Sequence, residues 1–165
     1  MDTTLNVFEN TDYMFDRRVT QSIVLDVSCG TTITFNETLV EPLVIDKLSD
    51  VYLDALTTFE CKSTDSKEDI GFLLTLDDLP IKTVSNNSNA NRALFIPNEQ
   101  TTLKDSATGP LLGRSHKGKK LNFICSINPQ KFTKLSGKLT LLDGSTTPFS
   151  STDGRFILDL SIIPR

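Results

Sequence analysis

The sequence shows no convincing cluster of the side chains that usually carry catalysis. Its one histidine, His116, lies in the basic sequence RSHKGKK, where we expect no strand or helix that would hold the imidazole in place. A Ser–His–Asp triad or a cysteine nucleophile would each need this same histidine as its general base. We therefore interpret His116 as a histidine in a solvated loop, and we predict that the protein is not an enzyme.

The three cysteines, Cys29, Cys61 and Cys125, are far apart in the sequence and form no CxxC pair. A structural zinc site needs four nitrogen or sulfur ligands, and a metal site of the cupin type needs several histidines. An odd number of cysteines also cannot close into a complete set of disulfides. We expect reduced cysteines that pack as small apolar side chains, with no bound metal and no cofactor.

Two pairs of adjacent acidic residues are further candidates for chemistry. Glu68-Asp69 and Asp77-Asp78 could each supply half of a glycosidase pair or part of a calcium site. No calcium-binding loop of the EF-hand type is present, and Asp77-Asp78 directly follows a predicted strand, where turns usually begin. We therefore interpret these acidic residues as turn and loop residues.

One basic stretch stands out against a chain whose formal net charge is −4. It contains Arg114, His116, Lys117, Lys119 and Lys120, and it could contact phosphate or an acidic patch on a partner protein. A solvated loop beside a strand is the alternative. No aromatic residues are interleaved with these cations, and the chain as a whole is acidic, so we expect no specific nucleic-acid partner.

The elements that must position these residues are almost all strands. Short segments that alternate between apolar and polar residues follow one another, separated by Gly, Pro, Asn and Asp. The predicted strands cover residues 19–27, 31–40, 43–45, 51–61, 70–76, 92–96, 121–127, 135–142 and 155–163. Residues 79–84 form either a further strand or a covering loop, and 98–120 form a long loop with one weak strand near 101–104.

This pattern predicts an all-β protein, an antiparallel β-sandwich of about eight strands. The long connections favour a single jelly roll, because its two Greek keys need crossovers between sheets. An immunoglobulin-like sandwich is the alternative, although the chain has no Trp and so lacks the Cys–Trp–Cys landmarks of that fold. We expect residues 19–165 to form one domain.

Residues 1–18 precede this domain and show no clear period. We interpret them as an extended N-terminal arm that packs on this domain or on a neighbour, with a frayed terminus as the alternative. Its candidate partner contacts are Phe8, Tyr13, Phe15, Arg17 and Arg18. We recognise no signal peptide in the sequence, so we expect a protein that is not secreted. We also find no apolar run long enough to span a membrane.

The last third of the chain resembles a known family. Residues 121–165 are similar to the C-terminal part of minor capsid proteins of nucleocytoplasmic large DNA viruses, which include viruses of algae and amoebae. The likeness is carried, in this order, by Ile127-Asn128-Pro129, the run LSGKLT at 135–140, Asp143-Gly144, the run FILDL at 156–160 and the closing Ile163-Pro164-Arg165. The run RALFIPNE at 92–99 is a further segment in the style of this family.

The resemblance implies a jelly-roll subunit in the layer beneath the major capsid protein, where it bridges capsomers and neighbouring minor capsid proteins. It also implies a virion location, assembly in the host cytoplasm, and no catalysis or cofactor. The alternative from the residues alone is a soluble sandwich that binds a carbohydrate or a peptide. A sugar site usually stacks the ligand on Trp or Tyr, and this chain has no Trp and only two Tyr.

Overall fold

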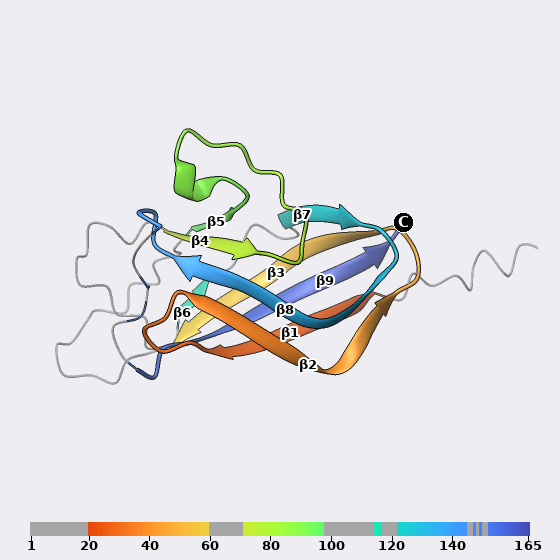
Figure 1. Cartoon of the computed structure of the whole chain (residues 1–165), viewed down its shortest axis with the longest axis horizontal. Helices are drawn as coiled ribbons and strands as arrows, with labels where there is room; N and C mark the ends of the chain where they lie inside the picture. Colours follow the sequence, from red (N-terminus) through yellow and green to blue (C-terminus); the bar gives the residue numbers. More distant parts are fainter. Residues whose placement is uncertain are drawn as a thin grey trace, which may run out of the picture.

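The computed structural model describes residues 20–59, 71–97, 114–116, 122–144, 147, 149 and 152–165. These residues form two antiparallel β-sheets that pack face to face (Figure 1). The expected N-terminal arm, the predicted loop at 62–69 and the weak strand near 101–104 lie outside the described residues.

Sheet A contains β1 (Gln21–Ser28), β9 (Arg155–Pro164) and β3 (Ser49–Phe59), with β7 (Asn122–Ile127) and β6 (Arg114–His116) both paired with β3. Sheet B contains, in order, β2 (Thr34–Ile45), β8 (Gln130–Thr140), β4 (Gly71–Leu76) and β5 (Leu94–Pro97). The helical element of the described chain is a short 3₁₀ turn, Ser88–Ala90, in the polar segment after β4. No helix in this part of the chain is long and apolar enough to cross a membrane.

The pairing of the strands is nested. β1 pairs with β9, β2 with β8, β3 with β7 and β6, and β4 with β5. β9 occupies one edge of β3, so β6 and β7 share the other edge and act as two pieces of one interrupted strand. Counted in this way, the described residues form one long hairpin of eight strands rolled into two sheets, which is the jelly roll that the sequence favours.

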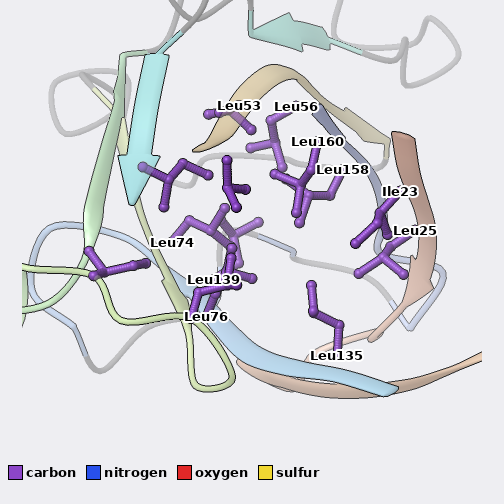
Figure 2. Close-up of a cluster of buried hydrophobic side chains, with 14 of the residues drawn as sticks. Ile23, Leu25, Leu53, Leu56, Leu74, Leu76, Leu135, Leu139, Leu158 and Leu160 are labelled. Atoms are coloured by element: carbon purple, nitrogen blue, oxygen red, sulfur yellow. The ribbon is translucent and has the colours of Figure 1, made fainter. Parts of the chain in front are cut away.

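The core lies between the sheets and follows from the period of two along each strand. On β9 the side chains of Phe156, Leu158, Leu160 and Ile162 point inward and are fully or almost fully buried. Figure 2 shows Leu53, Leu56, Leu158 and Leu160 of sheet A facing Leu74, Leu76, Leu135 and Leu139 of sheet B. Burial of each leucine side chain removes apolar surface from water, which stabilises the fold by about 1.5–3 kcal/mol.

Two predicted features differ from the structure, and one choice that the sequence left open is decided. Residues 114–116, expected in a loop, form β6 on the edge of β3. The segments 31–40 and 43–45, predicted as separate strands, belong to one strand, β2, whose register shifts between Thr38 and Leu43. This irregularity accommodates Pro42, which cannot donate a backbone hydrogen bond. Residues 79–84 form a covering loop in which Leu79 and Ile81 are buried.

The core can be tested with a matched pair of substitutions on neighbouring strands of sheet A. We expect Leu160→Ala to lower the free energy of unfolding by about 2–5 kcal/mol, because it leaves a cavity between the sheets. Val24→Ala removes an outward side chain that is 62% exposed and should change this free energy by no more than about 0.5 kcal/mol. Urea denaturation of both variants measures the difference, and equal losses would contradict the assigned inward face of β9.

Candidate functional site

The structure describes two of the predicted partner contacts. Arg114 and His116 lie on β6, where their Cα partners on β3 are Thr58 and Leu56. The interpretation of His116 as a residue of an unstructured loop is therefore wrong, because its backbone belongs to sheet A. The other predicted contacts lie outside the described residues: Phe8, Tyr13, Phe15, Arg17, Arg18, Lys117, Lys119 and Lys120.

The two described cysteines are not arranged for nucleophilic chemistry. Burial, with a smaller contribution from the charge of Asp50, raises the pKa of the Cys125 thiol to about 11. Burial also raises the pKa of Cys29, which is only partly buried. Both thiols are therefore protonated at neutral pH and are weak nucleophiles. Among the residues that the structure describes, no group of three or more His, Cys, Asp or Glu side chains is placed to hold a metal ion.

Asp78 joins the end of β4 to β8. One of its carboxylate oxygens accepts hydrogen bonds from both the backbone N–H and the hydroxyl of Ser136, each at 2.7 Å. The backbone N–H of Asp77 donates to the carbonyl of Ser136 at 2.9 Å. Asp77-Asp78 is therefore the turn that the sequence predicts, while Glu68-Asp69 lies outside the described residues.

A pocket of about 660 Å³ lies beside this turn. Its lining combines the apolar side chains of Leu76 and Ile81 with the charged groups of Lys82 and Arg92 and with Asp77. Arg92 has a φ of +58°, in the left-handed region that a non-glycine residue seldom adopts. The pocket could admit a small ligand that carries both polar and apolar groups.

Two arginine–carboxylate pairs lie on the outward side of sheet A. Arg155 of β9 donates two hydrogen bonds to the carboxylate of Asp26 on β1, and its guanidinium lies 5.4 Å from the centre of the Phe59 ring. The Nε of Arg165 lies 2.9 Å from both carboxylate oxygens of Asp50 on β3. These hydrogen bonds from arginine hold the pKa of Asp26 and of Asp50 below its ordinary value.

Between these pairs lies a second set of carboxylates, Asp54 on β3 and Asp159 on β9, which we call the acidic pair. The register places Asp159 opposite Ala55, next to a β-bulge that contains Asp54. The hydroxyl of Ser161 donates to Asp54. Burial, followed by repulsion from Asp54, raises the pKa of Asp159. Neither carboxylate forms a salt bridge with a described residue.

An aromatic pair lies one cross-strand row from the acidic pair. Tyr52 of β3 and Phe123 of β7 meet edge to face, with ring centres 5.8 Å apart. The side chain of Phe123 is 53% exposed, and Val24 on β1 is 62% exposed. Exposed aromatic and aliphatic groups beside charges are typical of protein–protein interfaces.

Sequence reasoning did not single out the acidic pair. Asp54 and Asp159 each occupy a polar position of an alternating strand, which is the ordinary pattern of a solvated face. The one feature of the sequence that could have indicated the acidic pair is that both strands carry an Asp at the centre of their polar face. Only the register of β3 against β9 brings the two carboxylates together.

Comparisons with known proteins add no family assignment. No model of a known protein family matches this chain, and no curated protein matches it as a relative.

The acidic pair predicts a stability change whose sign depends on pH. Since the folded-state pKa of Asp159 is raised, its ionisation disfavours folding above that pKa. Asp159→Asn should therefore raise the free energy of unfolding at pH 7, by about 0.5 kcal/mol. The gain should disappear as the pH falls below about 4, where Asp159 is protonated in the folded and unfolded states alike.

Asp26→Asn is the matched control on the same face. Its carboxylate has a lowered folded-state pKa, so its ionisation favours folding at neutral pH and the substitution should destabilise the protein there. This loss should also fade on acidification. Thermal unfolding from pH 3 to pH 8 measures both effects, and a destabilising Asp159→Asn at pH 7 would contradict the assignment.

Proposed function

We propose that this protein is a structural minor capsid protein. It bridges the capsomers of a major capsid protein and neighbouring minor capsid proteins in the icosahedral shell of a large DNA virus, which assembles in the host cytoplasm. The observation that carries the proposal is the nested pairing from β1 with β9 to β4 with β5, because the jelly roll recurs in viral capsid domains.

The positions of the family-like segments support this proposal. The run at 135–140 lies on β8 and the run at 156–160 lies on β9, which are interior strands of sheets B and A. Asp143-Gly144 forms the turn after β8, and Gly144 has a φ of +73°, which favours glycine. The residues that resemble the family therefore lie on two interior strands of the sandwich and on a turn that needs a left-handed backbone at Gly144.

The free edges of the sheets offer a way to join neighbours. β1 pairs with β9 along all eight of its residues, and no other described strand pairs with its opposite edge. Such an edge presents unpaired backbone N–H and C=O groups to which an extended segment of another chain can add as a strand. An N-terminal arm with aromatic anchors, such as residues 1–18, is suited to this role on a neighbouring subunit.

A ligand-binding module is the second candidate, and the pocket near Arg92 is the observation that favours it. Polar side chains converge there, including those of Asn128 and Gln130, and jelly rolls also occur in lectins. A thermal-shift screen with mono- and oligosaccharides and short peptides separates the two functions. A concentration-dependent rise in Tm that Arg92→Ala abolishes would favour the ligand-binding module.

Quantitative mass spectrometry of purified virus particles tests the structural role. We expect this chain at a fixed stoichiometry to the major shell protein, retained after loosely bound material is stripped. Its absence from particles would overturn the proposal.

Deletion of residues 1–16 tests the arm separately. We expect the truncated protein to keep the thermal unfolding profile of the full chain, because the first described strand of the sandwich begins at Gln21. Its incorporation into particles should be lost. Normal incorporation of the truncated chain would leave the capsid role in place and would exclude a function of the arm in assembly.

A further inference from the structure

The outward side of sheet B carries a row of lysines. Lys131, Lys134 and Lys138 are exposed on β8, and we call them the lysine row. The cross-strand partners of Lys134 and Lys138 on β2 are the neutral residues Thr38 and Thr34. Because β8 is an interior strand of sheet B, the lysine row lies within the face and not at its rim.

The charges of the lysine row are not neutralised within the described part of the chain. None of its three ammonium groups forms a salt bridge there. Two carboxylates lie near the row: Asp78, which is held by the two hydrogen bonds from Ser136, and the exposed Glu41 in the irregular part of β2 between Thr38 and Leu43. The three ammonium groups themselves remain without an ion pair among the described residues.

The opposite side of the sandwich has the complementary charge. The acidic pair, Asp54 and Asp159, lies on the outward side of β3 and β9, at the interior of sheet A. Arg155 and Arg165 pair with Asp26 and Asp50 on this face. The two sheets pack face to face (Figure 1). The outward side of sheet B, with the lysine row, and the outward side of sheet A, with the acidic pair, are therefore opposite faces of one molecule.

We propose that copies of this chain associate head to tail, with the lysine row of one copy on the acidic pair of the next. The contact is heterologous, since two different surfaces of the protein meet. It leaves one unoccupied contact surface at each end of a linear assembly of copies. This inference goes beyond the proposed function and does not depend on it, because it concerns the isolated protein.

The acidic face has the features that such a contact needs. A lysine placed beside Asp54 and Asp159 relieves the repulsion between the two carboxylates. The rings of Tyr52 and Phe123 lie one row away and offer an aromatic surface to the same ammonium groups. Because the charges are largely exposed, the association should be weak and should weaken further with added salt.

Sedimentation velocity of the full-length protein over a range of concentrations tests the proposal. We expect the weight-average sedimentation coefficient to rise with concentration at 50 mM NaCl, and the dissociation constant to increase at least about tenfold at 500 mM NaCl. A protein that stays monomeric at all concentrations in low salt would overturn the proposal, as would self-association that is insensitive to salt.

Two double variants identify the surfaces. D54N/D159N removes the acidic pair, and K134Q/K138Q removes two charges of the lysine row. Each should weaken self-association at least about tenfold, the scale of one lost charge contact at an interface. K82Q, which removes one exposed charge of the loop after β4, outside both surfaces, is the control and should associate like the unmodified protein. Circular dichroism and thermal unfolding confirm that each variant is folded.

A mixture of the two interface variants gives the decisive readout. Each retains the surface that the other lacks, so an equimolar mixture should form a one-to-one dimer that does not grow further. This result would show a heterologous contact between these two surfaces. If each variant loses association and the mixture stays monomeric, or if neither variant loses association, the proposal is wrong.

Discussion

The pairing of the last strand with the first and third strands is the constraint on which the sandwich depends. β9 lies between β1 and β3 and pairs with both over almost its whole length. Its inward side chains, from Phe156 to Ile162, form the centre of the core layer of sheet A. Because these contacts join the two ends of the described chain, sheet A closes only when nearly all of the chain is available, which is the high contact order typical of β-sandwiches.

The same pairing determines what each face of the sandwich presents. Once the inward residues of a strand are fixed by burial, the residues between them must point outward. On β3 and β9 these outward residues include the acidic pair, and on β8 they include the lysine row. The opposed charges of the two faces therefore follow from the alternation that builds the core. Asp78 and Cys125, which a catalytic interpretation would use, have structural environments instead. Asp78 accepts a hydrogen bond from the hydroxyl of Ser136, and Cys125 is buried on β7 beside β3.

Several features of the fold were predictable from the sequence, because their causes are local. The alternation at 19–27, 51–61 and 155–163 predicted β1, β3 and β9, and it predicted the buried faces of β1 and β9, since a strand with one buried side repeats every two residues. On β3 the predicted face is correct only as far as Leu53, because the β-bulge there reverses the alternation and buries Leu56 and Thr58. Asp143-Gly144 predicted a turn, because glycine accepts a left-handed backbone. β6 was missed, because three residues of the sequence RSH show no period. It is a strand only because the edge of β3 is available beside Leu56 and Thr58.

The sequence by itself determined the all-β class, most of the strands and the inward residues of the regular strands, because these depend on the order of apolar and polar residues along a few neighbouring positions. Tertiary structure alone decided which distant residues meet. The sequence drew attention to the clustered cations at 114–120. On β8, Lys134 and Lys138 share a face because alternate residues of a strand do so, and Lys131 joins them only because the alternation is interrupted between Phe132 and Leu135. Asp54 and Asp159 are neighbours only through the register of β3 against β9. Register depends on the packing of the whole sandwich, and no local segment of the sequence specifies it.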